Sequence, residues 1–239
     1  MNSFKKYLLD RFGDTAENLS KSDDGNKLVD EKCIMICLDD VATYLFDSFD
    51  EINEKYASTD ALYIIEREDY FEFYFFEFKG INFNLKEDKL QYLSKLKEHI
   101  NEMEMCEHDC SIGIEIKKCS EELVDKSFAK LKTKPYDSLS IISFYMNDFF
   151  KDKSSEDCVE ELFHIKKYYI LVSKTKGQYN PIMDIINPNG PKKNKSNRNN
   201  NITKPLRFMT RLRPYHYDNI ANINSDGFKE LINVLENRD

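Results

Sequence analysis

The sequence predicts an α+β (mixed α/β) protein in which a central mixed β-sheet is flanked by helices. Helical and strand patterns are mixed along the 239 residues without the regular β-α-β alternation of a purely parallel fold. Charged residues make up 33% of the chain, with only seven Gly and six Pro, which is typical of helices with solvated faces. The hydrophobic content of 41%, including seventeen Phe and fourteen Tyr, is ample for a globular core.

The chain is expected to divide into a polar, partly ordered leader over residues 1–30, with a short helix near Phe4–Phe12, and a single domain over residues 31–239. Apolar residues at helical spacing predict an amphipathic helix over 39–56. The apolar run Ile34–Leu38 before it is either a short strand or the first turns of that helix.

The middle of the chain is expected to hold a β-hairpin followed by helices. Aromatic and β-branched residues on both sides of a charged turn predict the hairpin over 60–83. An Asn-x-x-Glu capping box then opens a helix over about 85–105. The elements expected next are a short strand at Gly113–Lys117, with Ile112, Ile114 and Ile116 on one face, and two helices at about 120–131 and 138–151, separated by Lys134 and Pro135.

The last third is expected to alternate between regular and irregular structure. A short helix around 156–165 leads into a strand at Tyr168–Ser173, and a low-complexity polar stretch predicts a mobile basic loop at about 175–203. The expected strand over Leu206–Leu212 places Leu206, Phe208 and Leu212 on one face and Arg207, Met209 and Arg211 on the other. A closing helix near 226–237 carries Phe228, Leu231, Ile232 and Leu235.

Charge is distributed unevenly along the chain. Residues 163–217 contain twelve Lys and Arg against one acid, Asp184, so this segment carries +11 while the remainder of a chain of net charge −8 carries −19. The asymmetry indicates either an anionic partner, such as nucleic acid, or neutralisation of the acidic remainder by the basic segment. The candidate phosphate-contacting residues are Arg207, Arg211, Arg213, Lys192 and Lys193.

Three ionisable residues, Asp60, Glu77 and Lys79, lie in the most aromatic part of the chain. Side chains two residues apart on a strand share a face, so Glu77 and Lys79 point the same way. If the hairpin turns symmetrically about Glu68 and Asp69, the numbers of paired residues sum to 137, and Asp60 lies opposite Glu77. Two opposed carboxylates are destabilising unless a cation offsets their repulsion, so this register predicts a metal site. A shift of the register by one residue would separate the two carboxylates and remove the site.

Asp60 with Glu77-x-Lys79 on adjacent strands, after one helix and before another, resembles the PD-(D/E)XK nuclease superfamily over about residues 39–100. The resemblance implies a restriction-endonuclease-like core that hydrolyses phosphodiester bonds in DNA or RNA with a water activated by Mg²⁺ or Mn²⁺. It also implies that Asp60, Glu77 and the Phe78 backbone carbonyl bind the metal. Lys79 would then stabilise the attacking hydroxide or the charge on the phosphate.

The match to the family is not complete. The proline that usually precedes the aspartate is absent, since Ser58 and Thr59 come before Asp60. Gln91 matches a position where the family often has a polar helper, and a surface glutamine is the alternative. An acid and a lysine two residues apart on a strand also often form an ordinary ion pair. The alternative function is therefore a non-catalytic interaction protein, with a nuclease-like or unrelated α+β fold, that binds an acidic partner through its basic C-terminal third.

The remaining motifs are weaker. The chain has six cysteines, but the paired C-x-x-C spacing of zinc sites is absent, so reduced thiols are expected and neither zinc nor an Fe-S cluster. Neither an apolar run long enough to span a membrane nor a signal core is present, which predicts a cytoplasmic protein without a membrane partner. The sequence also contains no P-loop, G-x-G-x-x-G or G-x-S-x-G motif. The oligomeric state does not follow from the sequence.

Overall fold

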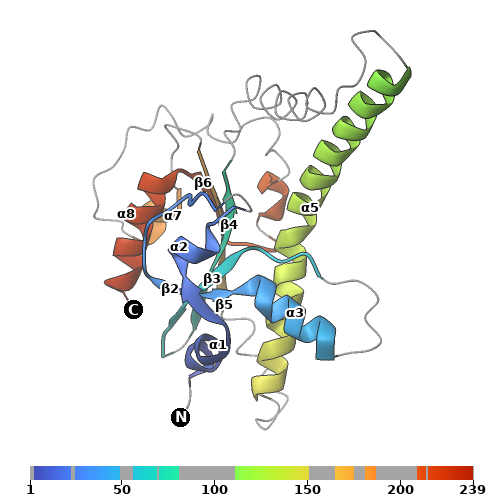
Figure 1. Cartoon of the computed structure of the whole chain (residues 1–239). Helices are drawn as coiled ribbons and strands as arrows, with labels where there is room; N and C mark the ends of the chain where they lie inside the picture. The colour runs from blue at the N-terminus through green and yellow to red at the C-terminus, as the bar shows by residue number, and fades with distance from the viewer. Residues whose placement is uncertain are drawn as a thin grey trace.

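The computed structural model describes residues 3–22, 25–48, 56–68, 70–80, 111–150, 165–174, 181–186, 209–213 and 215–238, with the backbone alone for residues 111–130. Its centre is an open six-stranded mixed sheet whose strand order follows the sequence (Figure 1). The strands are β1 (Gly13–Thr15), β2 (Ile34–Cys37), β3 (Ala61–Glu66), β4 (Phe71–Lys79), β5 (Ile165–Ser173) and β6 (Asn219–Ile223). Strands β1 to β4 pair antiparallel, and β4, β5 and β6 pair parallel. The α+β class with a central mixed sheet is confirmed.

Helices cover both faces of this sheet (Figure 1). One face packs against α1 (Phe4–Phe12), α3 (Leu38–Ser48) and the long α5 (Ser111–Phe150), and the other against α2 (Ala16–Leu19), α7 (Pro181–Ile186) and α8 (Ser225–Glu236). No helix among the described residues combines the length and the apolar character needed to cross a membrane.

Strand β4 supplies aromatic side chains to both hydrophobic cores. Phe73 and Phe75 lie in the core under α1, α3 and α5, while Tyr74 and Phe76 lie in the core under α7 and α8. A strand buried on both faces reads as a continuous apolar run because successive side chains point to opposite faces. The aromatic stretch of the hairpin is therefore the central strand of the fold.

Several expected elements are confirmed. The helix at Phe4–Phe12 is present, and its Phe4 and Leu8 are buried in the core, so part of the expected leader contributes to packing. Ile34–Cys37 is a strand, and helix α3 begins directly after it. The strand around Tyr168–Ser173 is present, and the closing helix buries the four residues expected of it. The helices expected near 85–105 and 156–165 lie largely or wholly outside the described residues.

Two expectations about residues 113–151 are wrong. Gly113–Lys117 is helical, and the two expected helices form the single helix α5 with Pro135 inside it. A five-residue alternation is weak evidence against a helix, and proline within a helix is tolerated when packing on both sides of it holds the helix in place. Here Leu131, before the proline, and Ile141, after it, are both buried in the core between the helix and the sheet.

The expected strand at Leu206–Leu212 is also corrected, because residues 209–212 form a 3₁₀ turn. Met209 and Leu212 are both buried, as the three-residue period of that helix requires, whereas alternation had placed them on opposite faces. Within the expected loop at 175–203, residues Pro181–Ile186 form helix α7 with Ile182 buried. Strands β1 and β6 were not predicted.

A buried polar cluster ties the end of the chain to β4. Glu72 is almost fully buried, and its carboxylate accepts hydrogen bonds from the Tyr74 hydroxyl at 2.5 Å and from Arg238 Nη2 at 2.9 Å. Arg238 Nη1 also donates to the Tyr74 hydroxyl at 3.2 Å, and the Tyr74 ring stacks on Tyr168. A buried carboxylate is tolerated only when it is paired, so Arg238 joins the residues after α8 to the sheet.

Replacing Arg238 with Ala should lower the free energy of unfolding by about 2 kcal/mol, because Glu72 stays buried without its cation while Tyr74 still donates to it. Urea unfolding at neutral pH measures the loss. Lys229→Ala is the matched control, since Lys229 is an exposed cation on α8. Equal stability of the two variants would contradict a stabilising role for the Arg238–Glu72 pair.

Candidate functional site

The register of the hairpin places Asp60 and Glu77 at one end of the sheet. Ala61 pairs with Phe76 and Leu62 with Phe75, so the numbers of paired residues sum to 137 as the symmetric turn predicted. Asp60 directly precedes β3, and Glu77 is in β4 one step beyond the last pair. Asp60 is held there by its backbone carbonyl, which accepts from the Leu38 N–H, and by its Oδ2, which accepts from the Phe78 N–H at 2.6 Å.

A lysine from the long helix joins these two carboxylates. Lys134 Nζ lies 3.0 Å from Asp60 Oδ1, 2.9 Å from Glu77 Oε1 and 3.0 Å from Glu77 Oε2. Because both carboxylates contact one nitrogen, the bonded oxygens are at most about 6 Å apart. Sequence analysis missed Lys134, which is separated from Glu77 by 57 residues and was noted only as the neighbour of a proline.

Lys79 contacts the same glutamate from the same strand. Its Nζ lies 2.7 Å from Glu77 Oε1, as expected for side chains two residues apart on one face of a strand. The Lys79 side chain is 32% exposed, whereas that of Glu77 is fully buried. The cluster therefore has a buried end at Glu77 and an accessible end at Lys79.

Burial and charge act on the protonation of the cluster. Burial, and then repulsion from Asp60, raise the pKa of Glu77 from 4.5 to about 7, although Lys79 and Lys134 oppose the rise. Burial alone would lower the pKa of Lys134, but the Asp60 and Glu77 carboxylates more than offset this and raise it above its ordinary value. Lys134 is therefore charged at neutral pH.

The polypeptide around the cluster is tied to helix α5. Ser138, which is buried, accepts from the Thr59 N–H at 2.8 Å, and its hydroxyl lies 2.7 Å from the Lys134 carbonyl oxygen. The Tyr217 hydroxyl donates to the Pro135 carbonyl at 2.7 Å. These bonds hold the residues before β3 and the Lys134 turn of the helix against each other, and thus fix the backbone at both ends of the Asp60–Lys134 contact.

The donor set fits a Mg²⁺ ion. Mg²⁺ is bound in proteins by one or two carboxylates and keeps several waters, and Asp60 and Glu77 supply two carboxylates within reach of one cation position. The N–H and C=O of a strand residue point toward the same neighbouring strand, so the Phe78 carbonyl faces the Asp60 side as its N–H does. The described residues hold no group of three or more His, Cys, Asp and Glu that could bind a metal ion.

A tyrosine hydroxyl is also buried on the same face of the sheet as Glu77. The Tyr169 hydroxyl is fully buried and has no hydrogen-bond partner among the described residues, and the charges of Glu77 and Asp60 act on it, raising the Tyr169 pKa further after the effect of burial. Tyr169 pairs with Phe75 in the parallel register, so its side chain lies on the Glu77 face. A buried donor without a partner is costly unless a water or another ligand satisfies it. Sequence analysis did not identify Tyr169 or Ser138.

Comparisons of the chain with protein-family models, with curated proteins and with solved structures found no match. The chemistry of the site is therefore inferred from the residues themselves.

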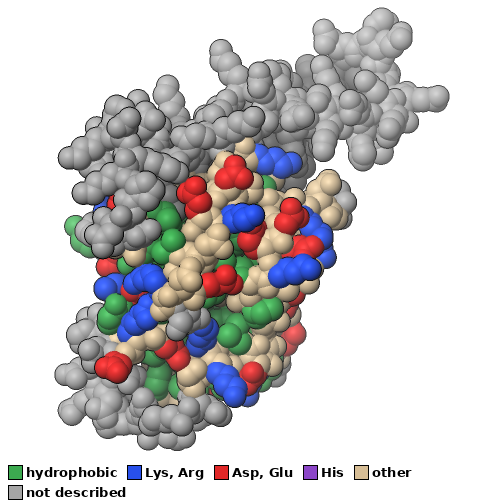
Figure 2. Space-filling model, turned by 90° about the vertical axis from the view of Figure 1, so that its left-hand side faces the viewer, with side chains coloured by type: hydrophobic (Ala, Val, Ile, Leu, Met, Phe, Trp, Pro, Cys, Tyr) green, Lys and Arg blue, Asp and Glu red, His purple; other side chains and the backbone are tan. Residues whose placement is uncertain are grey.

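The basic residues expected to contact phosphate are only partly described. Arg211 and Arg213 are exposed at the 3₁₀ turn before β6, whereas Arg207, Lys192, Lys193 and the candidate helper Gln91 lie outside the described residues. On the described part of the face in Figure 2, basic and acidic side chains are interspersed. This face therefore shows no gathering of one sign of charge on its described residues.

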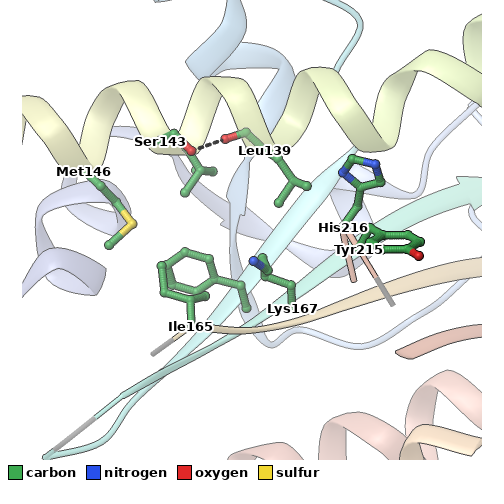
Figure 3. A pocket seen from close by; sticks show the side chains of 9 residues that line it. Leu139, Ser143, Met146, Ile165, Lys167, Tyr215 and His216 are labelled. Carbon is green, nitrogen blue, oxygen red and sulfur yellow. Dashed lines mark hydrogen bonds between the residues drawn. The ribbon is translucent and has the colours of Figure 1, made fainter. Parts of the chain in front are cut away.

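A separate pocket lies between helix α5 and the sheet, with a volume of about 300 Å³ (Figure 3). Its wall includes Ile142 and Met146 of α5, Phe73 of β4 and Ile165 of β5, with Lys167 and His216 as its basic members. None of the residues of the Asp60–Glu77 cluster lines it. The pocket is thus distinct from the candidate metal centre.

In EDTA, Glu77 should make the protein less stable as the pH rises. Its raised pKa means that the folded protein keeps a proton that the unfolded chain releases between pH 4.5 and about 7. The free energy of unfolding therefore falls across that window, and the penalty is complete above it. Urea unfolding of the wild type and Glu77→Gln at pH 5 and pH 8 tests this: the drop should be smaller in the variant. An equal or larger drop in the variant would contradict the assignment.

Proposed function

We propose that this chain is a metal-dependent, nuclease-like protein that hydrolyses phosphodiester bonds in DNA or RNA at the Asp60–Glu77 cluster. The observation that carries the proposal is that both carboxylates contact a single cation, the Lys134 ammonium, within 3.0 Å. A pair of acids that converges on one cation position, with a second lysine at its accessible edge, is suited to binding a divalent metal beside a phosphate.

Each residue has a definite task in this proposal. Asp60, Glu77 and the Phe78 carbonyl would hold the metal, which would lower the pKa of a bound water and offset charge on the scissile phosphate. Lys79 is partly exposed to solvent and its ammonium contacts Glu77. It would place a positive charge where negative charge develops on the phosphate. Phe75 and Tyr169, which are fully buried on the same face of the sheet as Glu77, would keep bulk water from the metal ligands.

The arrangement of the sheet also supports the resemblance to the PD-(D/E)XK superfamily. Strand β3, which follows Asp60, pairs antiparallel with both β2 and β4, and β4 carries the Glu-x-Lys element. The family normally has a further strand before the aspartate strand, and we assign β2 to that role in this proposal, although α3 lies between β2 and β3 here. After α5 the chain returns as β5, parallel to β4.

A second function is favoured by one observation. Lys134 and Lys79 already offer two positive charges to the two carboxylates, so the cluster is balanced without a metal. On this basis the chain could retain a nuclease-like core and bind nucleic acid, or another acidic partner, through its basic C-terminal third without cleaving it. A cleavage assay tests the catalytic function, and a separate binding assay tests the contact with nucleic acid.

With Mg²⁺ or Mn²⁺, the wild type should cleave at least one of linear DNA, supercoiled DNA, single-stranded DNA and RNA. Asp60→Asn, Glu77→Gln and Lys79→Met should each lose activity by about 100-fold or more, because each removes a metal ligand or a charge on the reacting phosphate. Asp10→Asn changes an exposed acid on α1 and should cleave like the wild type. Equal activity in all five proteins, or none in the wild type on any substrate, would reject the catalytic function.

Binding of a DNA oligonucleotide in EDTA should weaken steeply with salt. Arg211 and Arg213 are exposed cations at the start of the segment that leads into β6. Replacing both with Ala should reduce the slope of log affinity against log salt concentration by about 2, because each phosphate contact releases about one counter-ion. Fluorescence anisotropy at several salt concentrations measures the slope. An unchanged slope would remove these two residues from the binding surface.

A further inference from the structure

Lys134 occupies the place between Asp60 and Glu77 that the proposed metal would take. Its Nζ lies within 3.0 Å of both carboxylates, and it is the charged end of a side chain that is 15% exposed. An ammonium and a divalent ion cannot share this position, because both are cations and both need the same carboxylate oxygens. Metal binding at Asp60 and Glu77 therefore requires Lys134 to leave.

We propose that Lys134 is a built-in counter-ion that competes with the divalent metal for Asp60 and Glu77 and thereby sets the metal affinity of the site. This inference rests on the proposed function. It assigns to Lys134 a role as a positioning and regulatory residue, distinct from the role of Lys79 beside the phosphate.

The charge balance of the cluster favours such competition. Two carboxylates face two ammonium groups, so the cluster is close to neutral as it stands. A divalent ion added to this set would leave a net positive charge in a largely buried site, which is unfavourable unless one lysine moves away. Within the described part of the chain, the Lys79 ammonium pairs with Glu77 alone and is already partly exposed, whereas Lys134 holds both proposed metal ligands.

The side chain of Lys134 can leave while its backbone stays fixed. The helix turn that carries it is held by the Tyr217 bond to the Pro135 carbonyl and by Ser138, and neither bond uses the lysine side chain. A lysine side chain is a flexible stem of four carbons, so its ammonium can move by several ångströms through changes of side-chain rotamer, without movement of the backbone. Once displaced, the ammonium stays near the site, where a phosphate can take the place of the carboxylates.

The test measures metal binding directly, without substrate. Free Mn²⁺ is followed by electron paramagnetic resonance during titration of the wild type, Lys134→Met and Lys134→Gln. Removal of the competing ammonium should tighten Mn²⁺ binding by about 10-fold or more. The matched control is Lys132→Met, which removes an exposed lysine from the same helix two residues away and should bind like the wild type.

A second measurement covers variants that fold poorly. Without metal, the Lys134 variants should unfold at lower urea concentration than the wild type, since Asp60 and Glu77 are left without their shared cation, and Mn²⁺ should restore more stability to them than to the wild type. A Lys134 variant that folds only with Mn²⁺ would support the inference as well.

The failures of the two proposals are distinguishable. Mn²⁺ binding that is lost in Asp60→Asn but equally tight in the wild type and both Lys134 variants would overturn the competition and leave the metal site standing. Mn²⁺ binding in none of the proteins, the Lys134 variants included, would overturn the metal site itself, and with it the proposed function.

Discussion

The fold depends on two ion pairs, each between a buried carboxylate of the central strand and a cation from a distant part of the chain. Glu72 and Glu77 of β4 are both almost fully buried, and they point to opposite faces of the sheet because they are five residues apart. Neither can stay charged there without a cation, and each receives one from a distant part of the chain. Arg238 reaches Glu72 from beyond helix α8, and Lys134 reaches Glu77 from helix α5. The same two contacts therefore neutralise the core strand and tie a helix to each face of the sheet.

The register of the hairpin decides which of these partners meets which carboxylate. The pairing of Ala61 with Phe76 leaves Asp60 opposite Glu77. A shift by one residue would move the Phe73 and Phe75 side chains out of one core and separate the two acids. The register is thus enforced by aromatic packing along the whole strand, and the acidic pair is held together although its own charges repel. The energy that maintains the site comes from the core around it and from Lys134.

Features that depend on residues close together in the sequence could be predicted, whereas contacts between distant segments could not. The hairpin register follows from spacing alone, and the apolar stripe of α8 follows from helical periodicity. Lys134 could not be found that way, because its partner Asp60 lies 74 residues before it and the proline beside it favoured a helix end. Met209 and Leu212 were misplaced because a 3₁₀ turn has a three-residue period, which a short window does not distinguish from a strand. Local periodicity reports which face is apolar, but not which charges meet across the core.

Glu72 and Glu77 also show how a structural carboxylate differs from a candidate functional one on the same strand. Glu72 is bound by a guanidinium and a tyrosine hydroxyl, and in the described part of the chain no second acid forms an ion pair with that guanidinium. Glu77 shares its cation with Asp60 and is contacted by two lysines, and a buried tyrosine hydroxyl on its face of the sheet has no hydrogen-bond partner among the described residues. A stable core has no need of a second acid beside a buried glutamate, since the added repulsion has to be offset by another cation. The second carboxylate beside Glu77, and not burial alone, is what distinguishes a site suited to binding a metal from an internal ion pair.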